Sequence, residues 1–408
     1  MDLNQTPLAN RTHIAFFGIR NAGKSSIMNA LTNQNIAVVS PFKGTTTDPV
    51  HKAMELLPLG PVNIIDTAGL DDIGELGKLR IEKTKQILNK TDIAILVIDT
   101  TLDFTDFDRD ILKLITDKNI PYIVAYNKVD LMPDFKPKNE NIKQYVYISA
   151  KEKTGIEELK SKLVQVAKTK QEKFILKDIV NPKDTVVLVI PIDKAAPKGR
   201  LILPQQQVIR ELLDIGATAI MTQDDNLENT LANLKTKPKL IITDSQVFGK
   251  VNKIVPQDIE LTSFSILFSR YKGDLKRQVN AVKVLDTIKD DDKILIAEGC
   301  THHRQCDDIG TVKLPNWIKN YTKANPEFIF TSGTEFPDDL SKYKLIIHCG
   351  GCMLNQAEMQ SRLKKAHEQN IPMSNYGTTI AYIHGILNRT LHAVSYTHLR
   401  AHETRGNL

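Results

Sequence analysis

The sequence predicts an α/β protein made of successive units, each with a parallel sheet and helical crossovers. Apolar runs of strand length alternate with amphipathic segments of helix length along almost the whole chain. The most distinctive polar and cysteine motifs come directly after such runs, where open α/β sheets form their binding crevices. At 408 residues, the chain is also too long for one hydrophobic core, which favours two or three domains.

The composition is that of an ordinary soluble globular protein. The net charge of +6 is spread along the chain, which is too weak and diffuse to indicate nucleic-acid binding by itself. The longest apolar runs, such as Val186–Ile192, fall far short of the ~20 residues that span a bilayer. The polar segment Met1–Arg11 lacks the apolar core of a secretory signal. We therefore expect a cytoplasmic location and no membrane partner.

The first unit is expected over residues 7–168, with a charged linker at Lys168–Lys177. An amphipathic helix at about Ile156–Thr169 should close it. Its predicted strands are His13–Phe17, Val62–Ile65, Ile93–Ile98, Tyr122–Tyr126 and Tyr145–Ile148.

A glycine-rich loop follows the first predicted strand. The run Gly18-Ile19-Arg20-Asn21-Ala22-Gly23-Lys24-Ser25 matches GxxxxGK[ST] and precedes the helical segment Ser26–Leu31. In this placement backbone N–H groups wrap nucleotide phosphates, and the helix N-terminus adds a favourable partial charge. Lys24 is expected to reach the β- and γ-phosphates, and the Ser25 hydroxyl to coordinate Mg²⁺.

Two further segments are predicted to act on the metal and the γ-phosphate. In the run DTAG, the Asp66 carboxylate can hold Mg²⁺ through water, while Gly69 lets a backbone amide meet the γ-phosphate. A switch segment upstream should supply a second Mg²⁺-binding hydroxyl, from Thr46 or Thr47. Leu70 stands where Ras-like proteins place a water-orienting glutamine, so slow intrinsic hydrolysis is expected.

The base is predicted to be guanine. The run Asn127-Lys128-Val129-Asp130 follows a strand, and its terminal carboxylate can accept two hydrogen bonds that guanine offers and adenine does not. Ser149-Ala150-Lys151 follows another strand and can close over the base. The predicted nucleotide-binding residues are Gly18, Asn21, Ala22, Gly23, Lys24, Ser25, Ser26, Asp66, Gly69, Asn127, Lys128, Asp130, Ser149, Ala150 and Lys151, with catalytic roles for Lys24, Ser25, Thr46, Thr47, Asp66 and Gly69.

These motifs resemble those of the TrmE/Era-like GTPases, through Gly18–Ser26, Gly44–Thr47, Asp66–Leu70 and Asn127–Asp130. In potassium-activated members, the asparagine that matches Asn21 helps to hold a K⁺ ion that stabilises transition-state charge. The resemblance implies hydrolysis of GTP to GDP and phosphate that depends on Mg²⁺ and is stimulated by K⁺.

The second unit is expected over residues 178–262 and the third over residues 263–394, followed by a tail, 395–408, that is disordered or foreign sequence. No catalytic constellation appears in the second unit, so packing or dimerisation is its expected role. Its predicted elements are Val186–Ile192, Gln205–Asp214, Ala217–Met221, Leu227–Leu234 and Leu240–Thr243; those of the third unit are Phe264–Tyr271, Leu275–Ile288, Lys293–Ala297, Lys344–Ile347 and Asn355–Glu368.

All four cysteines fall within a 53-residue window of the third unit, which favours metal binding over disulfides in a chain without an export signal. Cys300-Thr301-His302 and His348-Cys349-Gly350-Gly351-Cys352 each follow a predicted strand, with 45 residues between the two histidines. Cys349 and Cys352 begin a predicted helix, so both sulfurs can face one metal. Three thiolates with a weaker fourth ligand suit zinc and a 4Fe–4S cluster equally well.

The fourth ligand has several candidates. His302 or His348 could bind the metal directly, or could orient a neighbouring ligand by hydrogen bonding. Cys306 is an ordinary thiol or an alternative ligand, and His303 is expected on the surface or a pocket wall.

A TrmE/Era-like domain followed by a central α/β domain and a CxH…HCxxC pattern is similar to the HydF family, the FeFe-hydrogenase maturation GTPases, over about residues 7–394. The resemblance implies a P-loop GTPase domain, a small α/β dimerisation domain and an α/β iron–sulfur cluster-binding domain. It implies that Cys300, Cys349 and Cys352 hold a 4Fe–4S cluster with a replaceable fourth ligand. It also implies a homodimer that carries a diiron subcluster and works with two radical-SAM maturases and the apo-hydrogenase.

An alternative function is an RNA- or ribosome-associated TrmE/Era-like GTPase with a structural zinc site. The absence of an RNA-binding motif and the aromatic content of 6% argue against it, so no nucleic-acid partner is expected. Arg270, Lys272, Lys276 and Arg277 are predicted to form a solvated helix face, with contact to RNA or a partner protein as the alternative.

Overall fold

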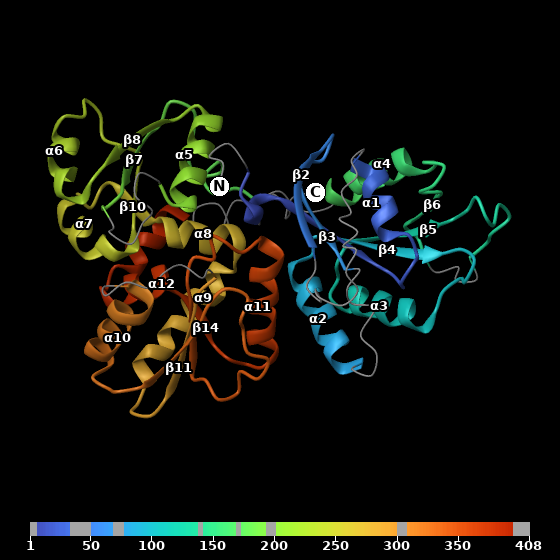
Figure 1. Ribbon diagram of the computed structural model, residues 1–408. Coiled ribbons are helices and arrows are strands. Elements are labelled where there is room, and N and C mark those ends of the chain that lie inside the picture. Colours follow the sequence, from blue (N-terminus) through green and yellow to red (C-terminus); the bar gives the residue numbers. More distant parts are fainter. Residues whose placement is uncertain are drawn as a thin grey trace, which may run out of the picture. The chain divides into compact units, whose positions relative to one another are not determined.

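The computed structural model describes residues 6–32, 50–67, 77–137, 142–168, 173–192, 201–299 and 308–394. The chain divides into two compact units, Met1–Glu172 (unit 1) and Lys173–Leu408 (unit 2), whose elements are labelled in Figure 1. No helix in the described ranges is long and apolar enough to cross a membrane.

Unit 1 is built on a six-stranded sheet in the order β2-β3-β1-β4-β5-β6. All neighbouring strands are parallel except β2, which runs antiparallel to β3. Ala15 in the central strand is paired with Ile65 on one side and Ala94 on the other. The strands are β1 (Thr12–Phe17), β2 (Val50–Leu56), β3 (Gly60–Asp66), β4 (Ile93–Asp99), β5 (Tyr122–Asn127) and β6 (Tyr145–Ile148).

The five mutually parallel strands were predicted from the sequence and are confirmed, whereas β2 was not predicted. It lies at the sheet edge, and its side chains alternate between exposed and half-buried from His51 to Glu55. Such a strand needs few apolar residues, so its sequence resembles that of a loop.

Helices cover both faces of this sheet (Figure 1). α1 (Lys24–Thr32) and α4 (Ile156–Lys168) pack on one face with Phe16 and Ile95. α2 (Gly77–Lys90) and α3 (Asp106–Asp117) lie on the other, where Ile87 and Ile111 join the core. Because β3, β1, β4, β5 and β6 are parallel, their carboxyl ends share one edge of the sheet, and the nucleotide motifs begin there.

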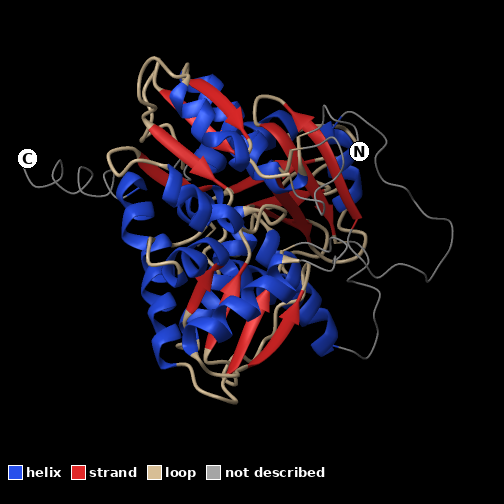
Figure 2. Cartoon of the chain, turned by 90° about the vertical axis from the view of Figure 1, so that its left-hand side faces the viewer, coloured by secondary structure: helices blue, strands red, loops and turns tan. Residues whose placement is uncertain are grey.

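Unit 2 contains two four-stranded sheets, both entirely parallel, in the orders β10-β9-β7-β8 and β12-β11-β13-β14. Figure 2 shows their strands flanked by helices. The strands are β7 (Thr185–Val189), β8 (Thr218–Thr222), β9 (Leu240–Thr243), β10 (Glu260–Ser263), β11 (Lys293–Ala297), β12 (Glu327–Thr331), β13 (Leu345–His348) and β14 (Met373–Asn375). The helices are α5 (Leu203–Ile215), α6 (Leu227–Ala232), α7 (Phe248–Ile254), α8 (Phe264–Lys272), α9 (Leu275–Val282), α10 (Leu314–Thr322), α11 (Gln356–Glu368) and α12 (Tyr376–Ile383).

One hydrophobic core runs through both sheets of unit 2. It includes Leu188 from the first sheet, Phe268 from α8, Ile296 from the second sheet and Ile380 from α12. α8 contacts α5, α11 and α12, so it joins the two halves of this core.

Two predictions for this region need correction. The helix predicted over Leu275–Ile288 ends at Val282 and continues as a 3₁₀ turn over Lys283–Thr287. The predicted linker is part of the folded unit 2 from Ile175 onward. Ile175 and Leu176 are buried, and their backbone N–H groups donate to the Glu211 carboxylate. Burial of these two apolar side chains stabilises the segment against unit 2, although charged residues surround them in the sequence.

Candidate functional site

The phosphate-binding loop joins β1 to α1, and two of its glycines have no room for a side chain. Gly18 has φ +141°, and a Cβ there would lie 2.3 Å from the Val97 carbonyl oxygen. Gly23 has φ +95°, and its Cβ would lie 2.1 Å from the Asn127 side-chain nitrogen. Asn21 adopts the left-handed conformation at φ 61° and is exposed. The loop therefore depends on residue types that tolerate positive φ.

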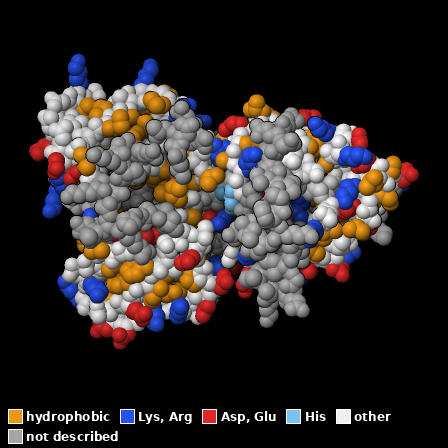
Figure 3. All heavy atoms as spheres, in the orientation of Figure 1, with side chains coloured by type: hydrophobic (Ala, Val, Ile, Leu, Met, Phe, Trp, Pro, Cys, Tyr) orange, Lys and Arg blue, Asp and Glu red, His pale blue; other side chains and the backbone are white. Residues whose placement is uncertain are grey.

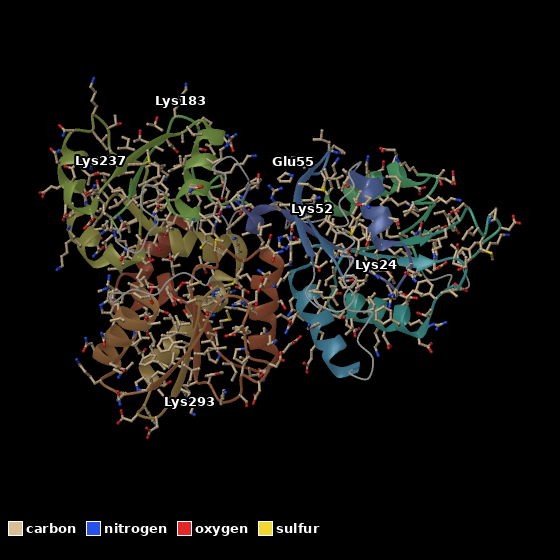
Figure 4. The ribbon with its side chains drawn as sticks, viewed as in Figure 1. Lys24, Lys52, Glu55, Lys183, Lys237 and Lys293 are labelled. Carbon is tan, nitrogen blue, oxygen red and sulfur yellow. The ribbon has the colours of Figure 1, made fainter. Side chains whose placement is uncertain are left out.

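Lys24 lies at the start of α1, where Figure 4 labels it. Its side chain is buried, and Nζ donates to the carbonyl oxygens of Gly18 (2.7 Å) and Ile19 (2.9 Å). The ammonium group thus lies against the loop that wraps phosphate in this class of site.

The two described Mg²⁺ candidates lie together. The Ser25 hydroxyl donates to Oδ2 of Asp66 at 3.0 Å, which joins the start of α1 to the end of β3. A hydroxyl and a carboxylate in contact form the hard-oxygen set that Mg²⁺ prefers. Thr46, Thr47, Gly69 and Leu70 lie outside the described residues.

Asn127 holds three loops together. It is buried at the end of β5; its Nδ2 donates to the Ala22 carbonyl at 2.8 Å, and its Oδ1 accepts from the Ala150 N–H at 3.1 Å. Lys128 follows in the left-handed conformation and forms an ion pair with Asp99. Asp99 is the last residue of β4 and does not belong to any predicted motif. The sequence feature that could have indicated its role is a polar residue at the end of an apolar strand.

The guanine candidate Asp130 is positioned by the next loop. The Ser149 hydroxyl donates to Oδ1 of Asp130 at 2.6 Å and accepts from the Glu152 N–H at 3.1 Å. Ser149 is buried and bonds through its backbone to Thr154 in both directions, whereas Lys151 is exposed. The structure thus joins two separately predicted motifs at the base-binding end of the site.

The cysteine site begins where β11 and β13 end side by side. Ala297 is paired with His348, and the Gly299 N–H donates to Sγ of Cys349 at 3.1 Å. The Gly351 N–H donates to the same sulfur at 3.4 Å. Gly299 is the residue directly before Cys300 in the sequence. Cys300, His302, His303 and Cys306 lie outside the described residues.

Cys349 and Cys352 are free, half-buried thiols in the part of the chain that the structure describes. Burial, followed by the nearby Cys352, raises the pKa of Cys349 to about 11, and burial also raises the pKa of Cys352. Within the described ranges no three His, Cys, Asp or Glu residues are grouped as a metal site. The two thiols, the N–H groups that donate to Cys349 and a neighbouring buried cation nevertheless fit a thiolate-bound metal centre.

His348 has both ring nitrogens engaged. Arg362 donates to Nε2 at 3.0 Å, so the proton is on Nδ1, which donates to the Cys349 carbonyl at 2.8 Å. Burial and the Arg362 charge lower the pKa of His348 to about 3. These contacts favour the orienting role over direct ligation.

The predicted solvated face is wrong for two of its four residues. Lys272 is buried, with 2% exposure, and Nζ lies within hydrogen-bond distance of three carbonyl oxygens in the loop after Cys349. Burial lowers the pKa of Lys272 to about 8. Arg270 makes a bidentate ion pair with Asp178, in which Nη1 donates to Oδ1 at 3.1 Å and Nη2 donates to Oδ2 at 2.6 Å. Only Lys276 and Arg277 are exposed as predicted.

Other buried polar residues around the cysteines were also not predicted. Arg362 donates to the Gly333 carbonyl at 2.7 Å and to the Glu358 carboxylate at 3.0 Å. Glu298, directly after β11, accepts from the Tyr376 hydroxyl at 3.2 Å. Glu358 is four residues before Arg362 on α11, but Gly333 and Tyr376 are distant in sequence from the residues they bond, so no local pattern marks these contacts.

The nucleotide loop, the Ser25–Asp66 pair and the Asn127–Asp130 motif on this sheet define a P-loop GTPase domain. Residues 13–128 match the family model described as 50S ribosome-binding GTPase. Residues 175–273 match the hydrogen maturase F dimerization domain, and residues 276–393 match the hydrogen maturase F tetramerization domain. The chain belongs to the hydrogen maturase F (HydF) family.

Similar curated proteins include tRNA modification GTPases MnmE. That of Desulforamulus reducens is 34% identical over 148 residues, covering 35% of this chain and 32% of that protein. That of Finegoldia magna is 36% identical over 168 residues, covering 39% and 36%. The chain thus spans about a third of the length of these relatives. Aquifex aeolicus Era bound to GDP·AlF4⁻ is 21% identical and covers 52% of this chain and 92% of its own, at a TM-score of only 0.33.

Proposed function

We propose that this chain is a GTP-hydrolysing scaffold and carrier that assembles and delivers the diiron subcluster of an FeFe-hydrogenase. The observation that carries the proposal is the cysteine site: the Gly299 N–H, directly before Cys300, donates to the sulfur of Cys349. Membership of the hydrogen maturase F family supports the same function.

Cys300, Cys349 and Cys352 would hold a 4Fe–4S cluster, with His302 as the histidine candidate for an exchangeable fourth position. Such a cluster would supply an iron site at which the diiron cargo can be held and released. The described residues have separate tasks: Gly299 and Gly351 donate hydrogen bonds to sulfur, and His348 orients the Cys349 peptide.

In unit 1, Lys24 would bind the β- and γ-phosphates, and Ser25 and Asp66 would hold Mg²⁺ together with Thr46 or Thr47. Asp130 would select guanine. Gly69 would present its amide to the γ-phosphate, and Asn21 would help to hold K⁺. We expect faster GTP hydrolysis when K⁺ replaces Na⁺ at equal ionic strength; equal turnover in the two salts would remove the potassium role.

GTP hydrolysis would time the release of partners, namely two radical-SAM maturases and the apo-hydrogenase. The protein would act as a homodimer. β8 is the outer strand of the first sheet in unit 2, and Met221 in it is 56% exposed. In Figure 3, hydrophobic side chains gather over α5 and β8. An exposed strand edge of this kind can pair with a second copy.

Anaerobic purification of the full chain tests the proposal. We expect brown protein with about four irons per chain, the content of one 4Fe–4S cluster. Alanine at positions 300, 349 and 352 should remove the iron and abolish maturation of the apo-hydrogenase, without changing GTP hydrolysis. Iron content and maturation that survive these substitutions would overturn the carrier function.

A second candidate is an RNA- or ribosome-associated GTPase with structural zinc, favoured by the match of residues 13–128 to the 50S ribosome-binding GTPase model. It predicts colourless protein with one zinc per chain and RNA binding that weakens as salt is raised.

A further inference from the structure

The ammonium group of Lys272 has as many acceptors as it has protons. Nζ lies 2.8 Å from the Leu354 carbonyl oxygen, 3.2 Å from that of Cys352 and 3.3 Å from that of Gly351. A lysine ammonium carries three N–H donors and no acceptor, so the three carbonyls can satisfy it completely. These carbonyls belong to the loop that carries Cys352, and Lys272 therefore fixes the backbone around that thiol.

The contact is reciprocal. The Gln360 side chain, in α11, donates to the Lys272 carbonyl at 2.7 Å and to the Gly273 carbonyl at 3.1 Å. The backbone at the end of α8 thus accepts hydrogen bonds from α11, the helix after the cysteine loop. The side chain of Lys272, the last residue of α8, donates to the cysteine loop itself. Two segments about 80 residues apart in sequence are joined in both directions.

The close contacts of the Lys272 ammonium group are carbonyl oxygens and an aromatic ring. Within the described ranges, no Asp or Glu is in ion-pair contact with Nζ, and the centre of the Phe268 ring lies 5.7 Å from it. Burying a cation is costly unless an anion lies near it. One of the carbonyl oxygens that Nζ contacts is that of Cys352 itself, which places the ammonium group beside this thiol.

We propose that Lys272 is a positioning residue of the cysteine site: it holds the Cys352 loop, and its positive charge stabilises the negative charge of a thiolate-bound metal centre. The inference rests on the proposed function in taking these cysteines as metal ligands. It does not depend on which metal binds, because three thiolates give both a zinc ion and a 4Fe–4S cluster net negative charge.

Three substitutions in the full chain separate charge from packing. Lys272→Met removes the charge and the donors, Lys272→Gln keeps donors without charge, and Lys272→Arg keeps the charge. Lys276→Met, at an exposed position four residues later, is the matched control. Each protein is reconstituted anaerobically with Fe²⁺ and sulfide, and its GTP hydrolysis and circular dichroism are compared with those of the wild type.

We expect the Met and Gln variants to lose iron to a chelator about tenfold faster than the wild type, as is usual when a partner of a metal ligand is removed. Their cluster midpoint potential should shift to more negative values, because the reduced, more negative cluster loses a nearby cation. Lys272→Arg and Lys276→Met should retain iron and keep the wild-type potential. If Lys272→Met does not fold, the iron retention and midpoint potential of Lys272→Gln are compared with those of Lys272→Arg, and that comparison tests the role of the charge.

Wild-type retention and potential in Lys272→Gln would overturn the inference. Equal losses in the Gln and Arg variants would also overturn the charge role, since they would indicate packing alone. If the wild type itself binds no iron, the proposed carrier function fails, and the same variants are titrated with Zn²⁺ alone. About tenfold weaker zinc binding in the Gln variant would then support the role of Lys272, and unchanged zinc binding would overturn it.

Discussion

In the nucleotide site, the motif residues support one another, whereas in the cysteine site residues outside the motifs support them. Ser25 bonds to Asp66, and Ser149 bonds to Asp130, each pair joining two predicted segments. Around the cysteines, by contrast, Arg362 holds His348 and Lys272 holds the Cys352 loop. A search for motifs therefore finds the described part of the first site apart from Asp99, but misses Lys272 and Arg362 in the second.

The largest expected effect tests whether the supporting residues of unit 2 matter. Arg362→Met would leave the Glu358 carboxylate and the His348 ring nitrogen buried without their partner, and should lower the free energy of unfolding of unit 2 by about 3–5 kcal/mol. Denaturant unfolding of the full chain measures this. Lys364→Met removes an exposed ion pair on the same helix and should cost less than about 1 kcal/mol. Equal midpoints for the two variants would contradict the expectation.

The next prediction tests the motif residues of unit 1. Asp130→Ala removes a carboxylate that can accept two hydrogen bonds from guanine, and should weaken GTP binding by about 100-fold. Equilibrium binding of a fluorescent GTP analogue measures it. Ser149→Ala, which removes only the support at 2.6 Å, should have a smaller effect. A larger loss in the serine variant would show that the loop, and not the carboxylate, controls affinity.

A third prediction compares two glycines with positive φ. Gly23→Ala adds backbone strain and places Cβ against Asn127, whereas Gly60→Ala at φ +89° meets no atom within 4 Å. We expect a loss in free energy of unfolding of about 1–3 kcal/mol for the first and about 1 kcal/mol for the second. Thermal unfolding with and without GTP distinguishes them, since only the first should also weaken nucleotide binding.

The smallest expected effect concerns association through β8. The bonds from Thr218 N–H to Asp184 and from Ile190 N–H to the Thr222 carbonyl show that even-numbered β8 residues face β7, so Met221 presents its backbone outward. Met221→Lys should weaken self-association by about tenfold by placing a charge on the edge. Sedimentation at several concentrations measures it. Met132→Lys, an exposed methionine in unit 1, is the control and should leave the oligomer unchanged.

The sequence was sufficient for most strands and for the nucleotide motifs because both are local signals. The five parallel strands of unit 1 are apolar runs, and the phosphate-binding loop, the DTAG run, Asn127–Asp130 and Ser149–Lys151 each begin at the end of one of them. β10, β12 and β14 were not predicted: they are short, and their runs, such as Glu327–Thr331 with its half-exposed phenylalanines, carry no clear boundary.

The support of the cysteine site could not be predicted for a different reason. A lysine such as Lys272, followed by Lys276 and Arg277, has the spacing of an exposed helix face. Its burial depends on carbonyls about 80 residues further along the chain, and no local pattern carries that information.

The exchange of hydrogen bonds between Lys272 and α11 also bears on how this protein can be divided. The two matched regions of unit 2 meet between residues 273 and 276, directly after Lys272. A fragment that begins at that boundary would keep all the cysteines but leave behind the cation beside them. Boundaries taken from family alignments therefore separate Lys272 from the Cys352 loop, and a fragment meant to carry the proposed metal site must begin upstream of α8.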